Sequence, residues 1–261
     1  MHLERSGGVA TITIDRPPVN AMSRAVVEAL ESTLDALATE AATRVALLRG
    51  AGPRGFSAGA DISEFPALLD PNADPRGEGI QRLADRVEAF PKPLVVAIHG
   101  FCLGGALEIA LACDVRVAAD DARIGLPEIR IGILPGGGGT QRLPRVIGPG
   151  RARLMIFSGE PVSGRRACEW GLVEEVVAPA EVFDAAAAIA RTLAAQSPHA
   201  LAVIKTLLRE TSGAPLGDGL RTETAAFARC LAHPDAREGI TAFLAKREPR
   251  WAVPGEGDAD A

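Results

Sequence analysis

The sequence predicts an α/β fold, because strand and helix patterns alternate along the chain up to about residue 178. From Pro179 onward only helical patterns follow, which indicates a separate helical region. Of the 261 residues, 47% are hydrophobic and 23% are charged, a mixture typical of a globular protein with one large domain. We therefore expect an α/β core over 1–195, a helical C-terminal region over 196–253 and a disordered tail over 254–261.

The elements of the first part of the chain follow from hydrophobic periodicity and turn residues. Residues 9–14 (V-A-T-I-T-I) alternate and are β-branched, which predicts a strand. An apolar stripe with Ser23 as a candidate N-cap predicts a helix over 20–37. We then expect a strand at 45–48, a turn of small residues at 56–65, a mobile loop at 70–79, a helix at 80–90 and a central strand at 94–98.

The second part begins with an apolar run that ends at Gly104-Gly105, where a helical pattern starts. A strand is expected at 114–119, followed after Pro135 by four consecutive glycines, a segment with almost no side chains to block a cavity. The remaining patterns predict helices at 150–157 and 163–170, a strand at 173–177, and helices at 180–195, 199–211, 220–230 and 234–246.

Charge and cysteine usage exclude several classes of function. The formal net charge of −5, with no run of basic residues, argues against a nucleic-acid partner. The four cysteines have no C-x-x-C spacing and form no metal-ligand pattern with the four histidines, which suits a reducing cytoplasm. The apolar run at 94–113 contains a histidine, a glutamate and several glycines, so we expect neither a membrane span nor a membrane partner.

Two glutamates, Glu108 and Glu128, stand in apolar and glycine-rich surroundings. Glu108 lies three residues after Gly105, about one helical turn along the same face. The free N–H groups at this helix start favour an anion. Two carboxylates beside a backbone anion site suggest acid–base chemistry on a substrate that develops negative charge. The alternative is that both are ordinary solvated residues.

A rival motif is Gly55-Phe56-Ser57-Ala58-Gly59, which matches the G-x-S-x-G nucleophile elbow of serine hydrolases. A nucleophilic serine needs a histidine base, and chain order leaves His199 and His233 as candidates. Both fall in the predicted helical region. The glycines at 136–139 do not satisfy G-x-G-x-x-G and no G-x-x-x-x-G-K-[ST] occurs, so we expect no dinucleotide or P-loop site.

Three stretches together make the chain resemble the enoyl-CoA hydratase/isomerase (crotonase) family. They are F-S-A-G-A-D-I at 56–62, L-G-G-A-L-E at 103–108, and G-L-P-E-I-R-I-G-I-L-P-G-G-G-G-T-Q-R-L at 125–143. The resemblance extends over almost the whole chain. It implies a spiral of ββα units, a C-terminal helical region that mediates trimer formation, and an assembly as a homotrimer or homohexamer.

The resemblance also implies roles for particular residues. The N–H groups of Ala58 and Gly105 would form an oxyanion hole for an acyl-thioester oxygen, and an amide near Gly136 would help to place a water molecule. Lys246 is a candidate phosphate contact. The implied substrate or CoA contacts are Ala58, Gly59, Ala60, Asp61, Ile62, Gly136 and Lys246.

Because both glutamates are present, the resemblance implies hydration of a trans-2-enoyl-CoA to a 3-hydroxyacyl-CoA in the cytoplasm. Glu108 and Glu128 would be the catalytic pair, with their division of labour left open. Coenzyme A would be part of the substrate, and no cofactor or metal is expected. The alternatives are a Δ3-Δ2-enoyl-CoA isomerase or other crotonase-type lyase, a serine hydrolase using Ser57, and a non-catalytic acyl-CoA binding protein.

Overall fold

The computed structural model describes residues 1–70, 72 and 79–251, and it contains two sheets. The larger sheet has the order β1-β2-β3-β5-β7-β10, with β1 and β2 antiparallel and the other neighbours parallel. All five residues of β5 are buried, as expected of a parallel strand covered on both faces. The strands are β1 (His2–Ser6), β2 (Val9–Ile14), β3 (Val45–Gly50), β5 (Leu94–Ile98), β7 (Val115–Ala119) and β10 (Glu175–Val177).

The smaller sheet has the order β4-β6-β8-β9. Its strands are β4 (Gly55–Ser57), β6 (Phe101–Leu103), β8 (Arg123–Gly125) and β9 (Val162–Ser163). Three times in succession the chain passes from the larger sheet to the smaller one and then into a helical segment, through the pairs β3-β4, β5-β6 and β7-β8. This repeated passage is the spiral of ββα units that the resemblance implies.

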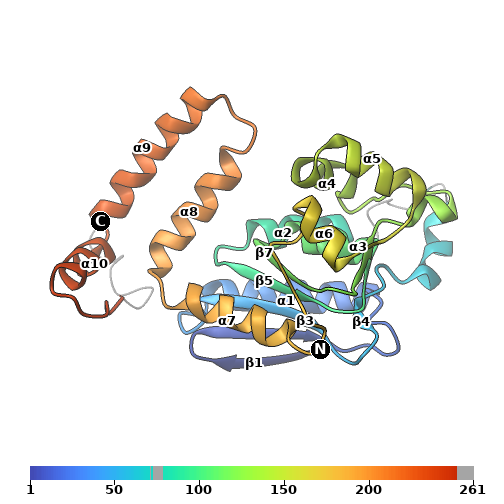
Figure 1. The fold of residues 1–261 in the computed structure, drawn as a ribbon, viewed down its shortest axis with the longest axis horizontal. Helices are drawn as coiled ribbons and strands as arrows, with labels where there is room; N and C mark the ends of the chain where they lie inside the picture. Colours follow the sequence, from blue (N-terminus) through green and yellow to red (C-terminus); the bar gives the residue numbers. More distant parts are fainter. Residues whose placement is uncertain (71, 73–78, 252–261) are drawn as a thin grey trace.

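Helices pack against the sheets of the α/β body (Figure 1). Helix α2 packs against α1 and α3, α3 packs against α4, and α7 lies over β3, β5 and β7. The helices of this body are α1 (Arg24–Thr39), α2 (Ile80–Ala89), α3 (Gly105–Ala112), α4 (Gly139–Ile147), α5 (Pro149–Ser158), α6 (Gly164–Trp170) and α7 (Val182–Ala194), with the 3₁₀ helices η1 (Ile62–Leu69) and η2 (Glu128–Ile131).

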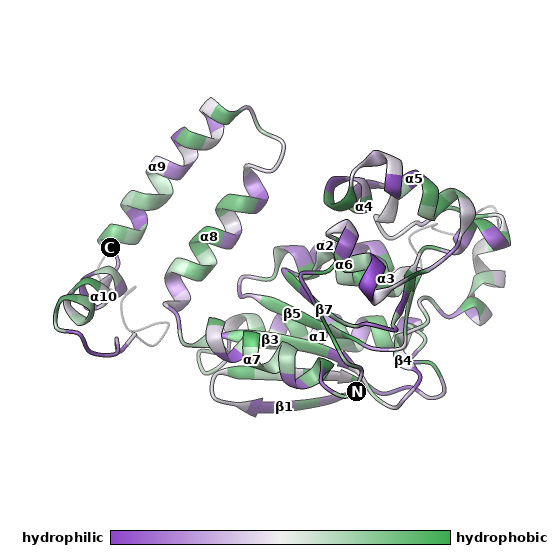
Figure 2. Cartoon of the chain, in the orientation of Figure 1, coloured by the Kyte–Doolittle hydropathy of each residue, from purple (hydrophilic) through white to green (hydrophobic). Residues whose placement is uncertain are grey.

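The last three helices, α8 (Pro198–Glu210), α9 (Leu216–Ala232) and α10 (Pro234–Leu244), extend away from the α/β body (Figure 1). Hydrophobic residues lie along these helices (Figure 2). Large apolar side chains remain more than half exposed there, including Leu208, Leu216, Phe227, Phe243 and Leu244. Within the described part of the chain no helix has the length and hydrophobicity needed to cross a bilayer.

Most predicted helices and strands are confirmed, with ends that differ by up to four residues, and the start of α1 is one of the largest differences. The helix expected from residue 20 begins at Arg24, with Ser23 at its N-cap. Asn20 instead has a left-handed φ of 53°. Its buried side chain donates to the carbonyls of Ala51 and Gly55 and accepts from the amide of Arg16, which ties the loop before α1 to the loop between β3 and β4.

Hydrophobic periodicity did not predict the short strands β4, β6, β8 and β9, the mostly exposed edge strand β1, or helix α4. A strand of two or three residues is too short to display a period, and α4 begins at the last of four glycines, which have low helix propensity. The predicted loop at 70–79 falls mostly, and the predicted tail at 254–261 wholly, outside the described residues. The boundary between 195 and 196 stays a prediction.

Candidate active site

Glu108 is placed by helix α3, all eight residues of which are buried. Its side chain is only 2% exposed. The Oε1 atom accepts a hydrogen bond of 2.7 Å from the backbone N–H of Gly139, the first residue of α4. A Cβ at residue 137 would lie 2.5 Å from Glu108 Oε2, so the chain passes this carboxylate too closely for any side chain there. The glycine run is therefore packed around Glu108 and is not simply an open segment.

Glu128 enters the site from the first residue of η2. Its Oε1 atom lies 3.0 Å from the position of a Cβ on Gly104, which has a left-handed φ of 55°. A side chain at residue 104 would therefore displace this carboxyl group. The Oε2 atom is buried and has no hydrogen-bond partner among the described residues, so the group has an unused polar atom in the site.

Both glutamates line one cavity of about 590 Å³, and the predicted pairing of the two carboxyl groups is thus present in the structure. The walls of the cavity are mainly apolar side chains and glycines, which suits an apolar ligand that is held by few polar groups. The residues that line it include Ala58, Ala60, Ile62, Phe65, Ile80, Gly105, Arg130, Ile131, Leu134, Gly136 and Gly137.

The predicted oxyanion hole needs a correction at one of its two amides. The N–H of Ala58 donates to the carbonyl of Val19 at 3.0 Å and is thus occupied. The N–H of Ala60 has no acceptor among the described residues. The chain pairs with Met22 at this point, but the two hydrogen bonds of that pairing use the carbonyl of Gly59 and the N–H of Asp61.

The Ala60 nitrogen lies only 3.4 Å from the position of a Cβ on Gly105. Gly105 is the first residue of α3, where the N–H groups have no partner within the helix. The free amide beside Gly105 is therefore that of Ala60, two residues beyond the predicted one.

Three further predicted contacts do not line the cavity. Gly59 has a φ of 94°, and a Cβ there would lie 2.5 Å from the carbonyl oxygen of Leu103, so it allows a close backbone approach. The carboxylate of Asp61 caps η1 by accepting from Ser63 and pairs with Arg16 at 2.6 Å. Lys246 follows α10 in the C-terminal helical region and is not among the residues that line the cavity.

The serine of the elbow motif has no catalytic surroundings. Ser57 is fully buried, and its hydroxyl donates to the carbonyl of Asn20 at 2.7 Å while accepting from the N–H of Gly59. The two candidate bases, His199 and His233, lie in the C-terminal helical region, where their rings stack with 3.8 Å between the ring centroids. The Ser57 proton thus points to a backbone oxygen and not to an imidazole, so the serine hydrolase hypothesis is wrong.

Two features of the site were not predicted from the sequence. Ile80 begins α2 and packs close to both Gly105 and Gly137. Arg142, on α4, donates to the carbonyl of Gly137. The amphipathic positions Leu143 and Ile147 of α4 were the available signal for a helix that would carry this arginine beside the glycine run.

The two carboxyl groups are electrostatically different. Burial raises the pKa of Glu108, while the amides of Gly139 and Gly137 and the charge of Arg142 oppose the rise. Burial raises the pKa of Glu128 to about 7, and the neighbouring charge of Glu108 adds to the effect. Glu108 thus has backbone donors and a positive charge that stabilise its ionised form, whereas the neighbouring charge at Glu128 disfavours ionisation, and the two groups titrate as a coupled pair.

The raised pKa of Glu128 predicts a pH-dependent effect of Glu128→Gln on stability. The carboxyl ionises more readily in the unfolded chain, so the native protein loses stability as the pH rises from 4.5 through 7. At pH 8 the variant should therefore be more stable by about 1–3 kcal/mol, the upper limit corresponding to the full pKa difference without solvent screening. At pH 4.5 the parent and the variant should have nearly the same melting temperature. Thermal melts at both pH values, with the exposed Glu28→Gln as control, measure this, and an equal gain at both would contradict it.

The fold and the site together define an α/β protein with two carboxyl groups and free backbone amides around an apolar cavity, a site suited to acid–base chemistry. The sequence model described as Enoyl-CoA hydratase/isomerase matches residues 4–254. The chain belongs to the enoyl-CoA hydratase/isomerase family.

Named relatives agree with this assignment. A probable enoyl-CoA hydratase of Bacillus subtilis is 45% identical over 93% of this chain and 95% of its own length. The 2,3-dehydroadipyl-CoA hydratase of Escherichia coli is 40% identical over 95% of this chain and 96% of its own. The crystal structure of an enoyl-CoA hydratase from Bacillus anthracis superposes with a TM-score of 0.92, at 37% identity, over 96% of this chain and 98% of that one.

Proposed function

We propose that the chain is an enoyl-CoA hydratase, which adds water reversibly to a trans-2-enoyl-CoA and forms a 3-hydroxyacyl-CoA in acyl-CoA metabolism. The observation that carries this proposal is that Glu108 and Glu128 line one apolar cavity beside free amides. Both relatives named above carry the name of a hydratase.

In the proposed reaction the thioester oxygen accepts hydrogen bonds from the amides of Ala60 and Gly105. The carboxylate of Glu108 takes a proton from water as the water oxygen bonds to C3. The electron pair of the C2=C3 bond moves to C2, which takes the proton of the Glu128 carboxyl. One C–O bond and one C–H bond form, one C=C π bond breaks, and the proton on Glu108 then returns to Glu128 through solvent exchange. Water and the enoyl thioester are the only reactants, so the reaction needs no cofactor.

The division of labour between the glutamates rests on their surroundings. The helix start at Gly139 supplies a backbone donor and a positive dipole end to Glu108, which stabilise its negative charge. Glu128 has a buried oxygen without a partner among the described residues and a pKa of about 7. We therefore assign Glu108 as the base that activates water and Glu128 as the acid that protonates C2. An amide near Gly136 remains our candidate for placing the water.

The remaining contacts and the assembly belong to the same proposal. Ala58 and Ile62 line the cavity and are proposed to contact the substrate. A contact between Lys246 and a CoA phosphate stays a proposal. The exposed apolar side chains of α8, α9 and α10 support a homotrimer or homohexamer, since large exposed apolar patches mark protein interfaces. Four free cysteines, two of them buried, suit the proposed cytoplasmic location.

The test is hydration of trans-2-enoyl-CoA substrates across a series of chain lengths, with 3-enoyl-CoA substrates in parallel. We expect the loss of absorbance of the conjugated thioester with 2-enoyl substrates and a much slower reaction with 3-enoyl substrates. Faster turnover of the 3-enoyl substrates would make the chain an isomerase. Binding of the whole series without turnover would make it an acyl-CoA binding protein.

A further inference from the structure

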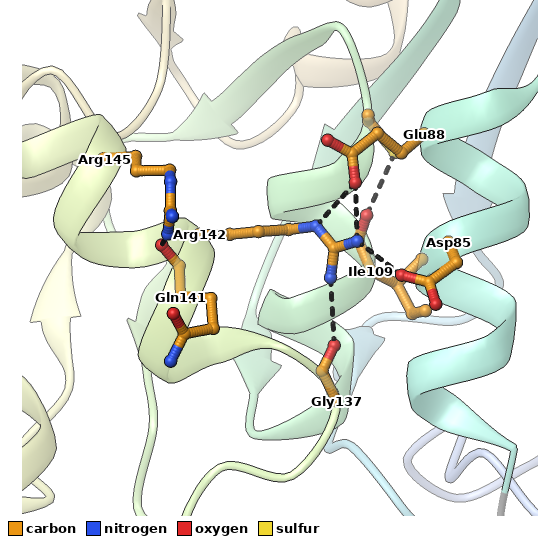
Figure 3. Close-up of polar contacts among 8 residues, drawn as sticks. Asp85, Glu88, Ile109, Gly137, Gln141, Arg142 and Arg145 are labelled. Atoms are coloured by element: carbon orange, nitrogen blue, oxygen red, sulfur yellow. Dashed lines mark hydrogen bonds and ion pairs between the residues drawn. The ribbon is translucent and has the colours of Figure 1, made fainter. Parts of the chain in front are cut away.

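Arg142, on α4, connects α2 with the glycine segment at 136–139 through hydrogen bonds (Figure 3). Its guanidinium donates to Glu88 at 2.6 and 3.0 Å and to Asp85 at 2.8 Å, both on α2. A third nitrogen donates to the carbonyl of Gly137 at 3.3 Å. The side chain is 15% exposed, so the ion pairs lie partly out of water. A planar fork with several donors is suited to such a multiple contact, which a lysine cannot reproduce.

The segment that Arg142 contacts is the one that holds Glu108. Gly139 donates to the Glu108 carboxylate, and Gly137 passes so close that no side chain fits. Consecutive glycines have large conformational freedom, so a fixed position for these amides requires an external anchor. The Arg142 guanidinium also occupies the space beside Gly138, at a φ of 105°. It is thus a side chain that packs on this segment and bonds to it.

We propose that Arg142 is a positioning residue for the hydration: it anchors the glycine segment that orients Glu108, and its positive charge stabilises the negative charge of the Glu108 carboxylate. The inference rests on the proposed function and goes beyond it, since Arg142 does not line the cavity. The titration of Glu108 is considered together with four nearby charged or titratable groups: Glu128 from η2, Arg142 from α4, and Asp85 and Glu88 from α2. Asp85 and Glu88 pair with the Arg142 guanidinium, so loss of the arginine or of the two carboxylates changes the net charge of this cluster in opposite directions.

The electrostatic part of the proposal predicts that two variants shift the acidic limb of the pH–rate profile in opposite directions. In Arg142→Gln the positive charge is lost, so the acidic limb of the kcat/KM profile, which reports the ionisation of Glu108, should move up by ~0.5–1 pH unit. In the double variant Asp85→Asn with Glu88→Gln two negative charges are lost while the arginine stays, so the same limb should move down. A role in folding alone would not produce this reversal.

The positioning part is read from the rate constants. Arg142→Gln should lower kcat by ~10–10²-fold, as expected when a catalytic group is slightly misplaced, while KM for the thioester changes by less than ~3-fold, as expected for a residue outside the binding surface. Arg142→Lys should restore the acidic limb but only part of kcat, because it keeps the charge and loses the fork. The matched control is Arg86→Gln: Arg86, also paired with two carboxylates, contacts Glu31 and Asp35 of α1. Its kcat and pH profile should stay unchanged.

Two results would overturn the proposal: a folded Arg142→Gln variant with the kcat and acidic limb of the parent, or an equal loss in Arg86→Gln. Should Arg142→Gln fail to fold, the α2 double variant decides, and an unmoved limb overturns the proposal. Infrared difference spectroscopy can follow the pH titration of the Glu108 carboxyl, with Glu108→Gln as the reference that lacks this band. The measurement tests the effect of Arg142 on Glu108 independently of any hydratase activity. It reads the effect of Arg142 even if the parent protein hydrates no enoyl-CoA.

Discussion

Replacing Glu108 or Glu128 by glutamine is expected to lower kcat for hydration by ~10²–10⁴-fold, the usual contribution of a general acid or base. Glutamine keeps the size of the side chain and can still accept the hydrogen bond from Gly139, so the fold should survive. The double variant should be little worse than either single one, because both groups act in the same step. Steady-state rates with a trans-2-enoyl-CoA measure this, with thermal melts as the control for folding.

The two variants should differ in a second reaction that needs only the acid–base group at C2. A saturated acyl-CoA exchanges its C2 protons with D2O when a base removes one of them. Glu128→Gln should lose this exchange and Glu108→Gln should keep it, if Glu128 is the group that faces C2. Hydration at the parent rate in either variant, or loss of exchange in Glu108→Gln alone, would refute the roles assigned here.

Gly105→Ala is expected to cause the second large loss, by filling the space between the two free amides. Its methyl group would lie 3.4 Å from the Ala60 nitrogen and 3.3 Å from Ile80 Cγ2, a tight contact that small side-chain movements can relieve. The helix should not suffer, since alanine has a higher helix propensity than glycine. The thioester oxygen, however, would no longer reach both N–H groups. We expect kcat/KM to fall by ~10²–10³-fold, as for the loss of one oxyanion donor.

The control for this variant is Gly150→Ala in α5, where nothing lies within 4 Å of the added methyl group. It should leave the rate unchanged and raise stability slightly, by about 0.4–1 kcal/mol. The infrared carbonyl stretch of a bound acyl-CoA reports directly on polarisation, and in Gly105→Ala it should return towards its value in water. A rate and a carbonyl stretch like those of the parent would place the oxyanion site elsewhere.

Periodicity located the long elements because their hydrophobic faces repeat many times. The amphipathic helix at 80–90 and the buried strand at 94–98 agree with the structure to within one residue. The same reasoning could not locate β6 or β8, which have three residues each. These short strands form the second sheet, so the sequence patterns alone predicted an α/β protein but not its two sheets.

In the site, too, some features could be predicted from the sequence and others depend on the fold. The apolar and glycine surroundings of Glu108 and Glu128 predicted a pair of functional carboxyl groups from the sequence. The sequence analysis predicted the oxyanion amide at Ala58, whereas the structure leaves the N–H of Ala60 free, because sequence does not tell which N–H is already bonded to another part of the chain. That Ala58 donates to Val19 follows only from the fold.

The family, the alternation of strands and helices, and the two acidic residues could all be predicted from the sequence, since these depend on local pattern and residue type. Only the tertiary structure decided which amides are free, that the Ser57 hydroxyl is occupied by a backbone carbonyl, and that Arg142 lies between α2 and the glycine segment. Hydrogen-bond satisfaction and electrostatic compensation depend on neighbours in space, and the residues concerned are up to 57 positions apart in the chain.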